Sequence, residues 1–436
     1  MRDILITVVV LGLLPFILRS PRIGAYVWAW LSMMNPHVAA YGFSRSIPFS
    51  QLVALTTLIS FLFSRDRHPF PFNNITITQL LLFLWMSLTC FFAINTTDIV
   101  LERWVFVFKI QLMLFVTFML IRGREQIERL IWVITLSIGF YGVKGGIWTV
   151  LGGGSGRVWG PTGSMIDDNN GLGLALVMLV PFMYFLHQVS TRRLVRAALV
   201  FAIITCCFSI LGSQSRGALL ALISMAFVLA LKGKRPIQMS ILLSTLLISA
   251  TLFMPESWSG RMDTIKDYET DTSAMSRIYT WKTMWALALD RPLVGGGFGS
   301  DNAVVFSLYA PEQVGSYVGG GVFVAHSIYF QALGEHGFPG FFLYFLLGIF
   351  TWKKAAQIAK KTESDAELGT WMPLLMRMVQ VSLAGFAAGG AFLSLMYFDL
   401  PYYIVGYVVL VDATLREREK QNIITQSAEN KIPTNS

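Results

Sequence analysis

Apolar segments follow one another along almost the whole chain, and short polar segments separate them. A run of about 20 apolar residues crosses the hydrocarbon core of a bilayer as a helix. The pattern therefore predicts an all-α polytopic membrane protein with about twelve transmembrane helices, because helices satisfy their own backbone hydrogen bonds in lipid. The second segment contains Asn35, Pro36 and His37, which suits an interfacial or broken helix. The expected spans are 4–18, 24–40, 48–64, 77–94, 102–121, 127–150, 171–187, 194–212, 216–231, 237–254, 326–351, 370–396 and 400–413.

One polar stretch, residues 255–325, is far longer than the other connections between apolar segments. Connections in compact domains are usually about 4–6 residues long, and much longer ones are commonly functional. We expect this stretch to form the lid and part of the wall of an active site. His326, where the next apolar helix is expected to open, would be its floor. Residues 276–289 within the stretch show apolar positions at helical spacing, which predicts an amphipathic helix on the membrane surface.

Composition agrees with a membrane protein and excludes a soluble one. The chain is 54% hydrophobic and 14% charged, and its mean hydropathy is +0.59, whereas average proteins contain about 25% charged residues. The formal net charge of +9 does not indicate nucleic-acid binding, because the basic residues lie in short loops between the apolar segments. Membrane lipids, and not nucleic acid, are the expected surroundings.

The basic loops predict the orientation of the chain in the membrane. Every cluster of lysines and arginines follows an odd-numbered span, so all clusters share one face, which is the cytoplasmic face by the positive-inside rule. The loops at 152–170 and 213–217 and the long stretch at 255–325 then share the opposite, extracytoplasmic face. The unusual polar residues of the chain therefore gather at one membrane surface.

This pattern divides the chain into five regions. They are an N-terminal transmembrane region at 1–150, a central transmembrane region at 151–254, the extracytoplasmic loop at 255–325, a C-terminal transmembrane region at 326–415 and a cytoplasmic tail at 416–436. The tail is polar, and its composition predicts disorder.

Three arginines of the extracytoplasmic face are candidate phosphate ligands. Arg216 lies at the membrane edge between two apolar segments, where an arginine is costly unless it reaches water or meets an anion. Arg277 begins the expected amphipathic helix, at the depth of lipid headgroups, and Arg261 is a third candidate. A guanidinium group grips phosphate oxygens in a bidentate manner. The competing interpretations are a lipid-headgroup anchor for Arg216 and an ordinary surface arginine for Arg261.

His326 is the candidate catalytic residue. At the amino end of a helix, the helix dipole disfavours a protonated imidazole. A neutral imidazole that faces outward can act as a general base. Glu335 is nine residues further along, about 180° around the helix, so it faces away from His326 and is expected to brace the fold. His336 also does not share the helix face of His326, so we do not expect the two histidines to bind one ligand together.

The loop at 152–170 contains three further polar candidates, Arg157, Asp168 and Asn169. Asp167 and Asp168 are either metal ligands or helix caps. We favour capping for Asp168, because a span begins at Gly171 and aspartate is a strong N-cap residue. No set of histidines, cysteines and carboxylates has the spacing of a metal site, so we predict no metal and no cofactor.

The glycine-rich run at 295–299 is not a phosphate-binding P-loop, because no Gly-Lys-Ser/Thr follows it. Two interpretations of this glycine-rich run remain open. The run either lets the backbone approach a ligand closely or forms a flexible turn.

These residues together resemble the O-antigen ligase and polymerase superfamily of bacterial envelope glycosyltransferases. The C-terminal half carries the match in Ser215-Arg216-Gly217, in Ser276-Arg277 through Gly295, and in His326 through Gly337. The family usually has asparagine after its histidine, where this chain has Ser327. Residues 28–37, Trp159-Gly160-Pro161 and Asp168-Asn169-Asn170 resemble the exosortase A-associated O-glycosylation ligases.

The resemblance implies a GT-C-like fold in the bacterial inner membrane, with the active site facing the periplasm. It also implies a donor glycan on undecaprenyl pyrophosphate and a metal-independent transfer that inverts the anomeric carbon. The acceptor would be lipid A core, a protein or a polysaccharide. A polymerase of the same superfamily is the alternative. A lipid-linked glycan transporter is less favoured, because Lys109 and Lys144 are the isolated ionisable residues in mid-membrane and no inverted repeat is visible.

Overall fold

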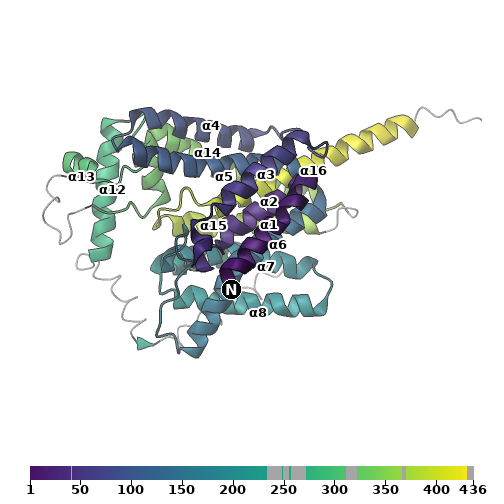
Figure 1. The fold of residues 1–436 in the computed structure, drawn as a ribbon, viewed down its shortest axis with the longest axis horizontal. Helices are drawn as coiled ribbons and strands as arrows, with labels where there is room; N and C mark the ends of the chain where they lie inside the picture. The colour runs from purple at the N-terminus through teal and green to yellow at the C-terminus, as the bar shows by residue number, and fades with distance from the viewer. Residues whose placement is uncertain are drawn as a thin grey trace, which may run out of the picture.

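The computed structural model describes residues 1–40, 42–232, 248, 255–256, 272–310, 322–365 and 370–429, and all regular structure among them is helical (Figure 1). The α-helices are α1 (Arg2–Arg19), α2 (Pro21–Met34), α3 (Phe49–Phe63), α4 (Asn74–Thr89), α5 (Thr97–Leu120), α6 (Gly123–Leu151), α7 (Asn169–Val189), α8 (Arg193–Gly212), α9 (Arg216–Lys232), α12 (Thr272–Asp290), α13 (Ala303–Tyr309), α14 (Ile328–Thr362), α15 (Trp371–Gly390) and α16 (Asp399–Glu429). Short 3-10 turns are η1 (Val38–Ala40), η2 (Phe43–Ser46) and η3 (Cys90–Phe92).

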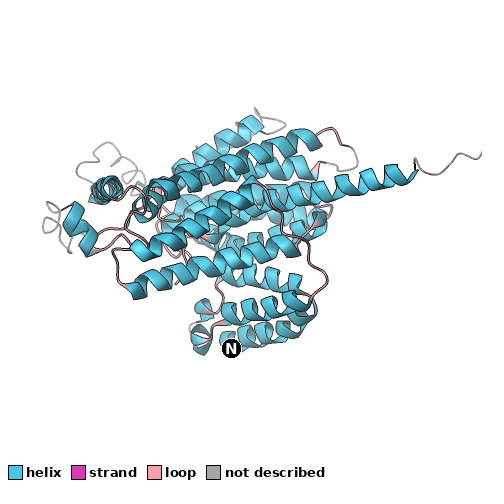
Figure 2. Cartoon of the chain, turned by 90° about the horizontal axis from the view of Figure 1, so that it is seen from above, coloured by secondary structure: helices cyan, strands magenta, loops and turns pink. Residues whose placement is uncertain are grey.

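Six helices in the described part of the chain are long and apolar enough to cross a membrane. They are α4 with η3, α6, α7, α8, α14 and α15. The chain is therefore a multi-pass membrane protein, as the apolar pattern predicts. The helix α7 is the most buried of the six, with 78% of its apolar window inside the protein, and Figure 2 shows the helices packed as one bundle. The expected span at 237–254 lies almost wholly outside the described residues.

Local sequence explains where several helices begin and end. Asn73 caps α4, because its side chain accepts hydrogen bonds from the backbone of Ile75 and Thr76. The second apolar segment is a broken helix, as its polar residues predict: α2 ends at Met34, and Asn35 takes the left-handed conformation with φ of 49°. Asparagine is one of the few residues that tolerate this conformation.

The C-terminal half of α16 projects from one end of the bundle (Figure 1), and basic residues from other elements pair with it there. Arg122, before α6, pairs with Glu417 at 3.1 Å, and Lys361, near the end of α14, pairs with Glu419 at 2.6 Å. The helices α12 and α13 of the long polar stretch lie at the opposite end. This separation is what the charge pattern predicts. The expected disorder from residue 416 is wrong as far as Glu429, because α16 continues as a helix whose first polar turns form these ion pairs.

The expected amphipathic helix exists as α12 and runs across the ends of α4 and α14 in Figure 1. Its apolar stripe, however, is partly buried within the protein. Met284 and Ala288 are buried, whereas Trp285 is 48% exposed. The reason is Gly334 of α14, where an added Cβ would lie 2.3 Å from the Met284 sulfur. The missing side chain lets α12 pack directly on α14.

Candidate functional site

His326 lies just outside α14 rather than within it, which corrects the expected helix start. The helix begins at Ile328, and Ser327 is its N-cap, with Oγ accepting from the Phe330 N–H at 3.5 Å. Ser327 therefore caps the helix in place of the asparagine usual in the resembled family. His326 itself has a φ of 43°. A positive φ is uncommon in residues other than glycine, and such strained residues cluster at functional sites.

The charges of Arg277 and Asp168 act on His326. The imidazole is half-buried, and burial lowers the pKa of His326 below its usual value. The Arg277 guanidinium lowers this pKa further, while the carboxylates of Asp168 and Asp301 oppose the shift. A lowered pKa leaves the imidazole neutral at neutral pH, which is the form that accepts a proton. The structure thus brings His326 and Arg277, from two separate elements, into one site with the capping aspartate of α7.

Side chains and carbonyl groups of three helices hold the backbone around His326. The Trp281 indole of α12 donates a hydrogen bond to the carbonyl oxygen of Ala325 at 2.8 Å, and its ring stacks on Phe330 of α14 with centroids 5.2 Å apart. The Tyr329 hydroxyl donates to the carbonyl oxygen of Ala387, on α15, at 2.8 Å. These contacts fix the residues on both sides of the histidine.

The turn at 213–217 packs beside this site. Gln214 has a φ of 54°, and α9 then begins at Arg216. The buried Asn169 side chain donates to the carbonyl oxygen of Ser213 at 2.6 Å, which fastens the turn to the start of α7. An added Cβ on Gly217 would lie 3.4 Å from Phe392, and the Phe392 ring lies 6.2 Å from that of Trp281. The start of α9, at Arg216, therefore lies near Trp281 of α12.

The remaining polar candidates of the loop at 152–170 have structural contacts. Asp168 is the N-cap of α7, as predicted, and its Oδ1 accepts from the backbone N–H groups of Asn170 and Gly171 at 2.6 and 2.8 Å. The exposed Arg157 donates to Gln214 Oε1 at 3.4 Å. Within the described residues, no three histidines, cysteines or carboxylates are grouped as a metal site requires. Arg261 lies outside the described residues.

Two family models match this chain, each over a different stretch. Residues 201–345 match the family described as O-Antigen ligase. The chain carries an O-antigen ligase domain. Residues 1–191 match a family of unknown function (DUF5935), and a comparison with curated proteins finds no match. The O-antigen ligase domain begins within α8 and ends within α14, so it contains Arg216, Arg277 and His326.

The glycine-rich run of the O-antigen ligase domain packs against a kink in α14. Gly337 has φ of 64° and ψ of −170°, which interrupts the helix. The N–H groups of Gly296 and Gly297 donate to the carbonyl oxygens of Gly334 and Glu335, both at 2.8 Å. An added Cβ on Gly295 would lie 2.4 Å from the Gly334 oxygen. The run does allow a close backbone approach, but the described partner is α14 and not a ligand.

A buried polar network supports this kink, and sequence reasoning missed most of it. Glu335 is 3% exposed, accepts from the Gly299 N–H at 3.2 Å and also accepts from the Tyr397 hydroxyl. Arg103 of α5 lies 3.6 Å from Glu335 and 3.2 Å from Asp301. His336 shares a 2.7 Å hydrogen bond with Tyr397. These contacts are those of a residue that braces the fold, which stays our prediction for Glu335. The sequence could have singled out Arg103, because it is an arginine inside an apolar segment.

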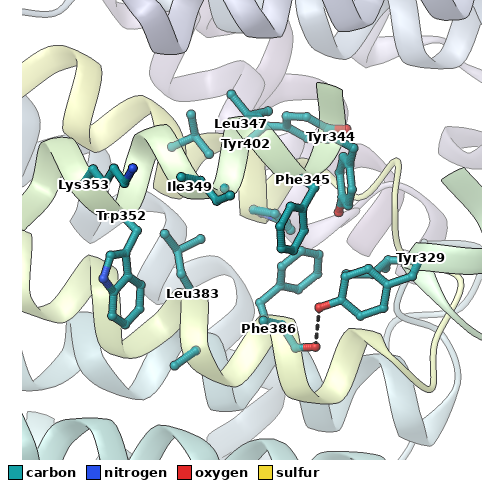
Figure 3. A pocket seen from close by; sticks show the side chains of 16 residues that line it. Tyr329, Tyr344, Phe345, Leu347, Ile349, Trp352, Lys353, Leu383, Phe386 and Tyr402 are labelled. Atoms are coloured by element: carbon teal, nitrogen blue, oxygen red, sulfur yellow. Dashed lines mark hydrogen bonds between the residues drawn. The ribbon is translucent and has the colours of Figure 1, made fainter. Parts of the chain in front are cut away.

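An apolar pocket of about 320 Å³ begins beside the histidine and runs between α14, α15 and α16. Figure 3 shows Tyr329, Phe345 and Phe386 toward one end of it and Trp352 with Lys353 toward the other. Tyr329 is three residues after His326, so the first end lies next to the site. The second end reaches the part of α14 that precedes its basic last turn.

Proposed function

We propose that the protein is a membrane glycosyltransferase that transfers a glycan from undecaprenyl pyrophosphate to an acceptor hydroxyl. The observation that carries the proposal is the half-buried His326, whose pKa is lowered by burial and by the charge of Arg277, within an O-antigen ligase domain. Such a transfer requires a base and a cation that binds phosphate within the same site. The proposal includes the exosortase A-associated O-glycosylation ligases as the nearest branch, with lipid A core, a protein or a polysaccharide as acceptor.

In the proposed mechanism, Arg216 and Arg277, together with Arg261, hold the pyrophosphate of the donor. His326 takes the proton from the acceptor hydroxyl, and the acceptor oxygen attacks the anomeric carbon. The bond between that carbon and the phosphate oxygen breaks, its electron pair stays on the phosphate, and undecaprenyl pyrophosphate leaves. A single displacement inverts the anomeric carbon. The guanidinium groups stabilise the developing negative charge, so the mechanism uses no metal.

The apolar pocket along α14 suits the lipid part of this donor. It is lined almost entirely by apolar and aromatic side chains, which favour an isoprenoid chain over water. Its first end lies beside His326, so a chain lying in it would keep its pyrophosphate near the arginines. Lys353, at the other end, can extend its ammonium toward the membrane surface.

The wider architecture in this proposal is a GT-C-like bundle of about twelve spans in the bacterial inner membrane. In this proposal, further helices cross the membrane besides the six long apolar ones, among them α1, α3, α5 and α9. The five regions expected from the sequence then keep their roles, with the loop at 255–325 on the periplasmic side. The concentration of basic residues at the α16 end supports the opposite, cytoplasmic assignment for that end.

The test is transfer by the purified protein in liposomes that contain the lipid-linked glycan and no ion gradient. We expect transfer by the wild type. His326→Ala should retain donor binding while turnover falls by about 10²–10⁴-fold, the usual contribution of a general base. Arg277→Lys should weaken donor binding almost as much as Arg277→Ala, because lysine lacks the planar fork of arginine. A well-folded His326→Ala protein with near-normal turnover would contradict the assignment of the base.

The products of the same assay separate the alternatives. A ligase joins a completed glycan once to lipid A core, protein or polysaccharide. A polymerase yields a ladder of repeat units that stays on the lipid. Movement of intact lipid-linked glycan between leaflets, without any new glycosidic bond, would identify a transporter.

A further inference from the structure

A second cavity, of about 470 Å³, is lined mostly by the N-terminal region that matches the family of unknown function. Its walls are the end of α2, the start of α3, the middle of α5, residues 163–166 and the start of α16. Cavities of about 300–1,000 Å³ are typical of sites for small ligands. The motif at 28–37, whose residues have no part in the mechanism above, supplies much of the lining.

The cavity lies at the same end of the bundle as His326. Residues 163–166 line it, and the same loop continues to Asp168, whose charge acts on His326. On another wall, Phe398 and Asp399 follow Met396, whose N–H donates to the Gln331 side chain of α14 at 3.3 Å. Two short connections therefore join the cavity to the candidate active site.

The lining combines aromatic rings with hydrogen-bonding groups. Trp28, Phe49, Phe106 and Phe398 contribute the rings. The polar groups include Asn35, Gln51, Ser164 and an Asp399 carboxylate that accepts from the Ser32 hydroxyl. A sugar ring has apolar C–H faces and hydroxyl groups around its edge, so it needs both kinds of surface. A few placed polar groups among aromatic side chains are how such sites fix a ligand.

Among the polar groups of the lining, Lys109 and the Nδ1 of His37 lack a partner within the described residues. Lys109 is a half-buried lysine in the middle of α5, and its ammonium group makes no hydrogen bond or ion pair with any described residue. The buried Nδ1 of His37 likewise has no hydrogen-bond partner in the described part of the chain. A cation at such a position is costly unless it meets an anion. A ligand with a negative group would satisfy Lys109.

We propose that this cavity is a subsite for a sugar unit that carries a carboxylate. The ring lies among the aromatic side chains, its hydroxyls bond to the polar groups, and its carboxylate pairs with Lys109. The role of the subsite in glycan transfer rests on the proposed function, since the bound unit would be part of the donor or acceptor glycan. Binding of the sugar itself does not depend on it.

The test is saturation-transfer NMR on the protein in lipid nanodiscs, without sugar detergents. The probes are methyl β-D-glucuronide and its uncharged counterpart, methyl β-D-glucoside. We expect the wild type to bind both probes and to prefer the glucuronide. Lys109→Gln should weaken glucuronide binding about tenfold, as expected for losing one charge-assisted contact, and leave glucoside binding unchanged. Lys144→Gln is the matched control, because Lys144 is an isolated lysine of α6 outside the cavity, and it should have no effect.

A second variant tests the cavity independently of charge. Gln51 lies exposed at its rim, so Gln51→Trp should block it without disturbing the core and abolish binding of both probes. Absence of probe binding by the wild type, or binding that neither Lys109→Gln nor Gln51→Trp changes, would overturn the subsite. Glucuronide binding lost in both variants, in a protein that makes no glycosidic bond, would support the subsite and contradict the proposed function alone.

Discussion

At the scale of single residues, the site depends on the charge balance around His326. Arg277 lowers the pKa of this histidine and Asp168 raises it. His326 and Arg277 are separated in sequence by part of the long polar stretch, so the sequence could suggest their roles but not their proximity. That proximity comes from tertiary contacts such as the hydrogen bond between Trp281 and Ala325, which no local pattern encodes.

This balance predicts opposite shifts in the pH dependence of kcat/KM. If His326 is the proposed base, the acid limb marks its pKa, because only a neutral imidazole accepts a proton. Arg277→Gln removes a positive charge, makes protonation easier, raises the pKa of His326 and so moves the acid limb to higher pH. Asp168→Asn removes a negative charge and moves the limb to lower pH, while asparagine still caps α7. The pH profile of each purified variant measures the shift, and shifts in the same direction would contradict the arrangement.

At the scale of elements, the spans were predictable and the kink was not. The apolar runs are local, and they gave α4, α6, α7, α8 and the start of α9 closely. The kink in α14 depends on a segment distant in sequence, the run at 295–299, which donates hydrogen bonds to the kinked turn. The helical extension of α16 depends likewise on ion pairs with other elements. Composition alone indicated a disordered tail there.

Two glycines of α14 offer a matched test of this kink. Gly337→Ala should destabilise the protein by about 1–3 kcal/mol or more, because its φ and ψ suit only glycine and its Cβ would lie 2.5 Å from the Leu293 oxygen. Gly348→Ala has nothing within 4 Å of the added Cβ, so it should be neutral or stabilise by up to about 1 kcal/mol. Thermal unfolding in one detergent compares the variants with the wild type. Equal unfolding temperatures for Gly337→Ala and the wild type would show that position 337 tolerates a side chain and would contradict this prediction.

At the scale of the whole molecule, the two ends of the bundle have different chemistry. One end carries His326, α12 and α13, and the other carries the ion pairs around the C-terminal half of α16. The sequence predicted this polarity because charge position is readable residue by residue. The cavity between α2, α3, α5 and α16 was not predictable, since its walls come from segments scattered over the chain.

The polarity predicts which thiols an impermeant reagent reaches. Ser155 and Ser307 are exposed at the His326 end, and Gln421 is exposed on α16. Cysteines at the first two positions should react from outside intact cells or spheroplasts, and a cysteine at position 421 should react only after lysis. The wild type, with its three cysteines, gives the background. The reverse pattern would invert the membrane orientation and move the proposed transfer to the cytoplasmic side.

The apolar pocket between α14 and α15 also has a kinetic consequence. A donor that enters through such a pocket arrives by lateral diffusion within the lipid phase, so the relevant concentration is its mole fraction among lipids and detergent. Added detergent at constant total donor should therefore lower the rate below saturation in proportion to the dilution of the micelle surface. Bulk volume at a constant donor-to-detergent ratio should have no effect. A rate that followed the bulk concentration would mean that the donor reaches His326 from water.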